Sequence, residues 1–399
     1  MTTKNPPHSI EYANEQFIVC GAKKMRCGFT TGSAAAMASK AAVHFLLTGE
    51  RLKTVQIMTP KRLFARADVI YPPITQSEPN RFRCGIVKDA GDDPDATDGC
   101  TIFATVELIV GENGVAVAID GAKGVGRVTK SGLDQAVGNA AINSVPRKMI
   151  ENEIRSECKT YGFSGKAIVT IDIPNGEEIA KKTFNAQLGI IGGLSVIGTT
   201  GIVEPMSEKA LVDALEAEIK VIAAESPSPR SIIVTPGEYG LSFLSAFAPQ
   251  LTQIPVVKCS NFIGSALDLI AAQGFSHVLI SGHAGKFVKL AGGIFSTHSR
   301  TADCRLELLA AHAALSGAHR ETVAAIMDCA TVDAALSVLD CACEVQTETV
   351  LQSLLTKIED HLDRRISGAF KWTFLMFTNV RGILCHSKNL FDFINEMPF

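Results

Sequence analysis

Hydrophobic and polar positions follow two different patterns along the chain, and the pattern changes near the middle of the chain. In the first half, short β-type runs succeed one another at residues 54–59, 64–71, 81–87, 101–110 and 115–119. The pattern also predicts an alanine-dense helix at 33–47, a helix at 146–161, a strand at 166–173, and a hairpin turn at 111–114, which reads Gly-Glu-Asn-Gly. Strands that follow one another without helices between them predict an α+β domain with a mixed or antiparallel sheet.

The second half alternates strands and helices. A helix predicted at 207–224 precedes the linker Ser-Pro-Ser-Pro at 226–229. Strands separated by helices are then predicted at 231–235, 254–258 and 277–281, which is typical of a doubly wound α/β domain. The rest of the chain predicts four helices and a last strand at 370–377. We therefore predict an N-terminal α+β domain at 1–195 and a C-terminal Rossmann-like α/β domain at 196–399.

Small and polar residues follow each of these three strands, at 235–240, 259–261 and 281–286. Parallel strands bring their carboxyl ends to one edge of a sheet, where ligands bind at the point at which the strand order reverses. The sequence therefore predicts a cofactor site at this edge, formed by Gly237, Tyr239, Gly240, Asn261, Gly282 and Gly285.

Residues 192–208 are apolar and rich in glycine, and they lead into the predicted helix with Pro205 at its first position. Glycines let a ligand approach the main chain, and free N–H groups at a helix start attract anions. We therefore add Thr199, Thr200 and Gly201 to the predicted cofactor contacts. A buried strand followed by a tight turn is the alternative. The uncharged stretch 183–203 has transmembrane length, but its glycines and amides favour interior strand and loop.

Two polar segments of the first half are candidates for chemistry. At 28–36, Thr30, Thr31 and Ser33 begin a helix, where hydroxyls and N–H groups can bind a substrate carboxylate or phosphate; an N-cap followed by close alanine packing is the alternative. At 88–98, Lys88 precedes five aspartates. These carboxylates could bind a hard cation, solvate a turn, or steer substrate and carry a proton. We favour the last role, with Asp89, Asp92 and Asp93 as catalytic candidates.

Cationic groups follow the strand at 277–281. His283 is a candidate proton donor, and Lys286 and His298 are candidates for binding anionic substrate groups. No third ligand accompanies the two histidines at a suitable spacing, so we predict no metal site.

Composition narrows the function classes. A net charge of −3 and a pI near 6.3 argue against nucleic-acid binding. The eleven cysteines are scattered, which favours reduced thiols, and residues 1–12 lack the apolar core of a signal peptide. We therefore expect a cytoplasmic protein without membrane partners, and homo-oligomerisation stays open.

Several segments together resemble the CbiD family. They are Gly-Phe-Thr-Thr-Gly within 28–36, Lys-Asp-Ala-Gly-Asp-Asp-Pro-Asp at 88–95, and the stretches 124–130, 141–147, 177–185, 192–208, 260–264 and 293–299, which occur in order from about 26 to 378. The chain departs from the family pattern at Asp98, where histidine is common, at Ser131, Ala136 and Ala140, where proline is usual, and at Ala284, where a larger aliphatic residue is usual. The first departure makes a catalytic role for position 98 doubtful.

The resemblance implies methyl transfer from S-adenosylmethionine to C-1 of cobalt-precorrin-5B, giving cobalt-precorrin-6A, in anaerobic cobalamin biosynthesis. Cobalt would arrive within the corrinoid substrate, whose acetate and propionate groups explain the anion-binding features. Two other functions stay open at this point: an ATP-dependent small-molecule kinase, suggested by residues 28–36, and a tetrapyrrole carrier without turnover.

Overall fold

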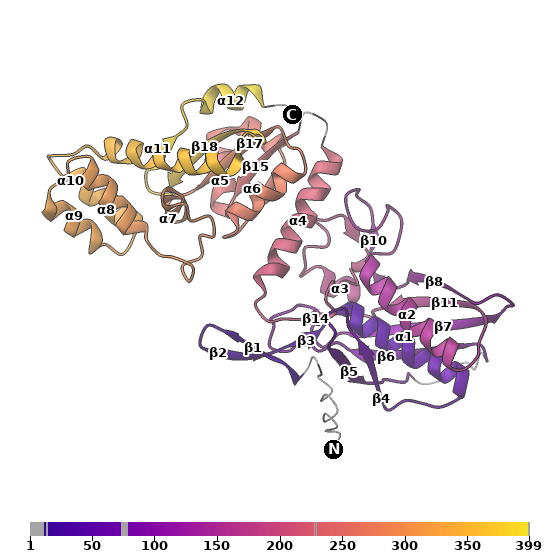
Figure 1. Cartoon of the computed structure of the whole chain (residues 1–399). Helices are drawn as coiled ribbons and strands as arrows, with labels where there is room; N and C mark the ends of the chain where they lie inside the picture. Colours follow the sequence, from indigo (N-terminus) through magenta and orange to yellow (C-terminus); the bar gives the residue numbers. More distant parts are fainter. Residues whose placement is uncertain (1–11, 13–14, 73–78, 227, 229, 398–399) are drawn as a thin grey trace, which may run out of the picture. The chain divides into compact units, whose positions relative to one another are not determined.

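The chain forms two compact units, Met1–Glu208 and Lys209–Phe399 (Figure 1). The computed structural model describes residues 12, 15–72, 79–226, 228 and 230–397. The predicted linker prolines 227 and 229, and residues 1–11 of the segment considered as a signal peptide, lie outside this part. The boundary between the two units lies after Glu208 and not between residues 195 and 196, as predicted. The reason is that β14 (Ile202–Val203) pairs with β3 (Gly28–Phe29), which keeps residues 196–208 in the first unit.

A mixed four-stranded sheet is the centre of the first unit. Its order is β6 (Arg81–Val87), β7 (Thr101–Val110), β11 (Gly165–Asp172) and β8 (Val115–Gly121). The β6–β7 and β7–β11 pairs are antiparallel, whereas β11 and β8 are parallel. The mixed sheet predicted from the sequence is thus confirmed.

The predicted hairpin at 111–114 is wrong, because β11 lies between β7 and β8. Gly111 donates its N–H to the Ser164 carbonyl at 3.1 Å, and Gly165 donates to the Gly114 carbonyl at 2.7 Å. The connection therefore crosses the end of an intervening strand. Residues 111–114 do connect β7 and β8, but a local turn signal cannot reveal that a later strand lies between these two strands.

Helices α1 (Thr31–Thr48) and α2 (Ser144–Thr160) pack together, with α1 also lying against β6 and β7 (Figure 1). Thr30 caps the start of α1, and Gly49 ends it with a φ of 77°. The helix turns fully buried alanines toward its neighbours: Ala34, Ala35, Ala36, Ala38, Ala41 and Ala42. Small side chains let the backbones approach closely, which explains why this helix is rich in alanine.

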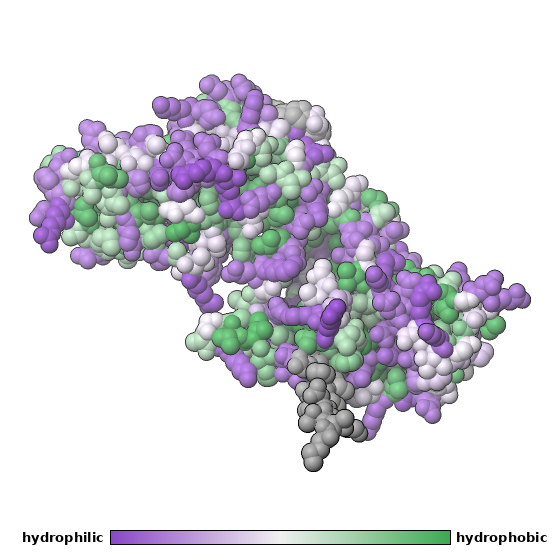
Figure 2. Space-filling model, in the orientation of Figure 1, coloured by the Kyte–Doolittle hydropathy of each residue, from purple (hydrophilic) through white to green (hydrophobic). Residues whose placement is uncertain are grey.

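Short elements surround this core. The hairpin of β1 (Phe17–Cys20) and β2 (Lys23–Arg26) carries exposed apolar side chains, and Figure 2 shows a hydrophobic patch over it. Three other strand pairs occur: β4 (Thr54–Met58) with β5 (Phe64–Asp68), β9 (Gly124–Val125) with β13 (Gly193–Leu194), and β10 (Arg127–Val128) with β12 (Ile190–Ile191). Helix α3 (Gly176–Ala180) packs on β13.

The helix predicted to begin at Pro205 begins later. Helix α4 spans Glu208–Glu225, and Met206 has a φ of 58°, which a right-handed helix does not allow. Residues 183–203 form turns and short strands rather than a continuous helix. None of the helices in the described part of the chain has the length and apolar character needed to span a bilayer.

A five-stranded sheet is the centre of the second unit. Its order is β16 (Val256–Lys258), β15 (Ser231–Thr235), β17 (His277–His283), β18 (Lys371–Thr378) and β19 (Gly382–His386). The first four strands are parallel, and β19 is antiparallel to β18. Every residue of β15 is buried, as expected for a strand covered on both faces.

Helices cover both faces of this sheet (Figure 1). On one face, Ile233, Leu279 and Leu375 pack with α5 (Glu238–Phe247), η2 (Pro249–Gln253) and α12 (Leu390–Glu396). The opposite face packs with α4 and with α6 (Ile263–Ala272), α7 (Ala284–Phe287), η3 (Val288–Gly292), α8 (Arg305–Leu315), α9 (Arg320–Met327), α10 (Val332–Cys341) and α11 (Thr347–Ile366). The alternation read from the sequence thus corresponds to a parallel sheet between helical layers.

Candidate functional site

The acidic loop, residues 89–98, is held by an arginine that the sequence analysis did not select. Arg26 at the end of β2 donates from both terminal nitrogens to Asp89, at 2.6 and 2.7 Å. This hydrogen-bonded pair lowers the pKa of Asp89 although burial opposes the shift, and the Gly91 N–H supports the ionised form. No local pattern links residues 26 and 89, so only the fold could reveal the pair.

The other two predicted catalytic acids also accept main-chain hydrogen bonds. Asp92 accepts the N–H of Arg26 at 2.6 Å, and Asp93 accepts the N–H of Met206 at 2.9 Å. The loop therefore joins β2 to the segment that leads out of the first unit.

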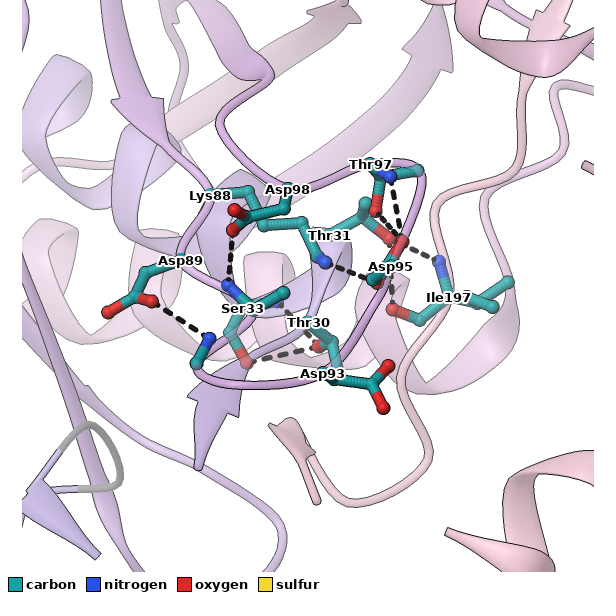
Figure 3. A network of polar contacts seen from close by, with 12 residues as sticks. Thr30, Thr31, Ser33, Lys88, Asp89, Asp93, Asp95, Thr97, Asp98 and Ile197 are labelled. Atoms are coloured by element: carbon teal, nitrogen blue, oxygen red, sulfur yellow. Dashed lines mark hydrogen bonds and ion pairs between the residues drawn. The ribbon is translucent and has the colours of Figure 1, made fainter. Parts of the chain in front are cut away.

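The end of the loop is organised around Lys88, which is buried and paired with Asp95 (Figure 3). Burial disfavours ionised Asp95, but the ammonium of Lys88 and hydrogen bonds from Lys88 and Thr97 outweigh it, so the pKa of Asp95 is lowered. Asp98 accepts the N–H of Ala90 at 2.8 Å. Within the described residues, no group of three or more His, Cys, Asp or Glu side chains is arranged to hold a metal ion.

The sequence predicts accessible hydrogen-bond donors at the start of α1, but two of the side chains concerned are buried there. Thr31 and Ser33 are only 3% and 0% exposed. The Thr31 hydroxyl donates to the Ile197 carbonyl at 3.2 Å and accepts the Ile197 N–H at 3.0 Å (Figure 3). The Ser33 hydroxyl donates to the Gly201 carbonyl at 2.6 Å. Residues 197–201 thus occupy the donors that were expected to bind a substrate anion.

Close backbone approach explains the glycines of that segment. Gly198 has a φ of 145°, and a Cβ there would lie 2.2 Å from the Thr30 hydroxyl oxygen. At Gly201, with a φ of 79°, a Cβ would lie 2.7 Å from the Thr59 Cβ. These glycines serve packing against α1. Thr200 bonds to the Ile202 main chain, whereas Thr199 is exposed.

A second group of predicted residues lies at the carboxyl ends of β15, β16 and β17, here called the carboxyl edge. Gly237 has an extended backbone, with a φ of 176°, and a Cβ there would meet no atom within 4 Å. Tyr239 is 70% exposed. A Cβ on Gly240 would lie 1.8 Å from the Thr235 hydroxyl oxygen, so this position needs glycine for packing.

The histidine loop after β17 is ordered by its own main chain. His283 accepts the Gly285 N–H on Nδ1 at 3.1 Å, and its ring meets Phe377 edge-on at a centroid distance of 5.8 Å. Gly282 lies against the ring of Phe287, where a Cβ would be 2.5 Å from ring atoms. The imidazole is therefore oriented, whereas Gly282 has a packing role.

Ser281 at this edge was not selected from the sequence. It is fully buried, and its hydroxyl has no hydrogen-bond partner among the described residues. Val234 pairs with Ile280, so Thr235 and Ser281 are the next neighbours along β15 and β17. The strand order reverses between these two strands. The only sequence signal is a serine at the end of an apolar run, directly before Gly-His.

The loops after β16 and β17 contact each other, and the segment at 297–300 adjoins them. Lys286 donates to the Ser260 carbonyl at 3.2 Å, and Asn261 accepts the Thr297 N–H at 2.9 Å through its carbonyl. His298 accepts the Arg300 N–H on Nδ1 at 3.1 Å. Burial raises the pKa of the Cys259 thiol to about 12, which leaves it protonated and unreactive at neutral pH.

The predicted residues thus form two groups, one in each compact unit. Those at the acidic loop and the α1 start belong to the first unit: Thr30, Thr31, Ser33, Lys88, Asp89, Asp92, Asp93, Thr199, Thr200 and Gly201. Those at the carboxyl edge belong to the second: Gly237, Tyr239, Gly240, Asn261, Gly282, His283, Gly285, Lys286 and His298. The predicted cofactor contacts are therefore divided between the units.

Comparison with known proteins places both units in one family. A family model described as CbiD matches residues 18–205, and one described as CbiD, C-terminal domain, matches residues 296–388. A solved structure described as cobalamin biosynthesis protein (cbiD) from Archaeoglobus fulgidus is 26% identical, covers 73% of this chain and 88% of that chain, and has a TM-score of 0.39.

Curated relatives cover the chain more fully. A protein of Ruminiclostridium cellulolyticum named cobalt-precorrin-5B C(1)-methyltransferase is 44% identical over 96% of this chain and 98% of its own length. A protein of the same name from Thermoanaerobacter sp. is 44% identical over 82% of this chain and 86% of its own length. On these matches, the chain belongs to the CbiD family.

Proposed function

We propose that this chain is a cobalt-precorrin-5B C(1)-methyltransferase, which transfers a methyl group from S-adenosylmethionine to ring carbon C-1 in anaerobic cobalamin biosynthesis. The observation that carries the proposal is the 44% identity to a relative of that name over nearly the full length of both chains. Similarity that includes both compact units favours a shared reaction over a shared domain alone.

The proposed methyl-donor site is the carboxyl edge of the second unit, taken as a Rossmann-like domain. Its order, β16-β15-β17-β18-β19, reverses between β15 and β17. In parallel α/β sheets, nucleotide-type ligands bind in the crevice at such a reversal. Gly237 after β15 and His283 at the end of β17 lie on its two sides.

The residues at this edge suit such a ligand. The open space beside Gly237 leaves room for a ligand near the main chain. Tyr239, mostly exposed at the start of α5, offers a ring on which a flat group could stack. Thr199, Thr200 and Gly201 belong to the other unit and are less suitable, because Gly201 is packed and Thr200 bonds to its own main chain.

The bound donor supplies a methyl group on a positively charged sulfur, which is open to in-line displacement by a carbon nucleophile. The contribution of this chain is then binding and orientation, together with exclusion of water. His283, fixed through Nδ1, presents its other ring nitrogen as the group available for proton transfer. In the first unit, Asp92 and Asp93 are the proposed acidic groups, because each has one carboxylate oxygen without a hydrogen bond among the described residues, whereas both oxygens of Asp89 bind Arg26.

The kinase alternative has little structural support. A Cβ on Gly28 would lie 2.2 Å from the Asp89 carbonyl oxygen, and Ser33 is completely buried. A phosphate-binding loop instead needs glycines and hydroxyls that are open to the nucleotide. In this chain the same residue types hold loops against α1.

The test of the proposed function is a mass measurement under anaerobic conditions. Purified protein, S-adenosylmethionine and cobalt-precorrin-5B are incubated, and the corrinoid is expected to gain one methyl group while S-adenosylhomocysteine accumulates in equal amount. Binding of both ligands without a mass change would instead support the tetrapyrrole carrier. ATP-dependent phosphorylation would support the kinase.

A further inference from the structure

Two lysines follow β17 on consecutive turns and lie close to the carboxyl edge. Lys286 belongs to α7, and its ammonium donates to the Ser260 carbonyl in the loop after β16, at 3.2 Å. Lys289 belongs to η3 and is only 3% exposed. Its ammonium donates to the carbonyls of Thr297 and Ala302, at 3.0 and 2.8 Å. Both charges therefore meet only neutral oxygens.

Neither ammonium has an ion-pair partner within the described residues. Asp303 is near enough for Lys289 to influence its titration, but its oxygens bind Arg305 at 2.7 and 3.0 Å. A buried charge is normally paired, because its removal from water is costly. An ammonium has three donors, and carbonyls account for two of those on Lys289.

The charge of Lys289 also acts on Lys286. Burial lowers the pKa of Lys286, and the like charge of Lys289 adds to that effect. An anion beside the Lys286 ammonium would offset both effects, the burial and the repulsion from Lys289. The position of the two lysines fits a ligand site at the carboxyl edge. Lys286 contacts the loop after β16. Lys289 holds the loop that contains Thr297, and Thr297 in turn bonds to Asn261 at the edge.

We propose that Lys286 and Lys289 form a carboxylate-binding subsite at the carboxyl edge. This inference deepens the proposed function and rests on it. The carboxylate can come from the amino-acid part of the methyl donor or from an acetate or propionate arm of the corrinoid. Lys286 is the more accessible partner, and Lys289 supplies a second, buried charge.

The test uses three variants of the full chain. Lys286→Gln and Lys289→Met remove one charge each while keeping most of the side-chain length. Lys371→Gln is the matched control, because Lys371 is exposed at the start of β18, opposite His277 and at the other edge of the same sheet. Thermal unfolding of each variant reports whether the fold is retained.

Calorimetry then measures four dissociation constants for each protein. The probes are S-adenosylhomocysteine, its decarboxylated counterpart, cobyrinic acid, whose arms are free carboxylates, and cobinamide, whose arms are amides. Loss of a charge-assisted hydrogen bond is expected to weaken binding about ten- to hundredfold. The first two probes form one pair and the last two form another, and in each pair only the first member carries the carboxylate in question. If the subsite exists, both lysine variants should bind the carboxylate-bearing member of one pair more weakly. Their affinity for the other member of that pair, and the affinities of the Lys371→Gln control, should be unchanged. Selective loss within the first pair identifies the donor as the source of the carboxylate, and selective loss within the second identifies the corrinoid.

The contradictory results are equally distinct. If Lys289→Met weakens both members of a pair equally while Lys286→Gln weakens neither, Lys289 only holds its loop and the subsite is rejected. Wild-type affinities in both variants also reject it. If the unchanged protein binds none of the probes and transfers no methyl group, the proposed function fails, and this inference fails with it.

Discussion

At the scale of single residues, the ion pair of Arg26 with Asp89 gives a testable dependence of stability on pH. The folded protein lowers the pKa of Asp89 below its ordinary value of 3.8. The ionised pair therefore stabilises the fold at neutral pH, and this contribution disappears as the pH falls through the lowered pKa. Urea unfolding at pH 7 and near pH 3 should show that Asp89→Asn is less stable than the unchanged protein at pH 7, with a smaller difference at the acidic pH. An equal difference at both values would mean that the pair does not contribute through its charge.

Asp93 carries the second prediction at this scale. Asp93→Asn keeps an oxygen that can accept the Met206 N–H, so folding should be retained. If Asp93 moves a proton in the reaction, kcat and kcat/KM should fall together by about 100-fold. Asp92→Asn tests the other candidate in the same way, since asparagine keeps an oxygen that can accept the Arg26 N–H. Equal rates for both variants and the unchanged protein would leave the loop with a structural role only.

At the scale of elements, the close approach of residues 197–201 to α1 predicts a large cost for added side chains. Gly201→Ala should destabilise the protein through its left-handed backbone, by about 1–3 kcal/mol, and through overpacking against Thr59 by a similar amount. Gly99→Ala is a matched control, because its φ of 70° resembles the 79° of Gly201 while its Cβ would meet nothing within 4 Å. Free energies of unfolding for the two variants should therefore differ by the packing contribution. Equal losses would show that backbone strain alone explains the glycine.

The elements also show where sequence reasoning works and where it stops. Periodicity located α1, α2 and the alternating strands and helices around β15, β16 and β17, because burial on one or both faces leaves a local pattern. The pairing order left no such pattern, so the insertion of β11 between β7 and β8 was missed. The hairpin of β1 and β2 was also missed, since each strand has only four residues and neither alternates polar and apolar positions.

The same limit applies to the candidate site. Residues beside strand ends could be selected because the chain order places them at one edge. Arg26 is distinguished by a contact across the fold and Ser281 by the absence of a hydrogen-bond partner, and a local motif shows neither of these. Thr31 and Ser33 show a related limit: the sequence predicts hydroxyls at the start of a helix, but the segment that covers them comes more than 160 positions later.

At the scale of the whole molecule, each unit has its own hydrophobic core. A ligand that binds to one unit should therefore stabilise that unit and slow hydrogen exchange near its binding site. A ligand at 100 times its dissociation constant stabilises the form that binds it by about 2.7 kcal/mol. Hydrogen-exchange mass spectrometry with S-adenosylhomocysteine should therefore show slower exchange at 236–240, 259–262 and 283–289, with little change at 28–36 and 197–201. Gly237→Leu should abolish this protection without unfolding the protein, because its backbone is extended and its Cβ would be in open space. Protection confined to 197–201, or full protection in Gly237→Leu, would place the methyl donor elsewhere. Since the predicted cofactor contacts are divided between the units, this measurement decides which group binds the donor.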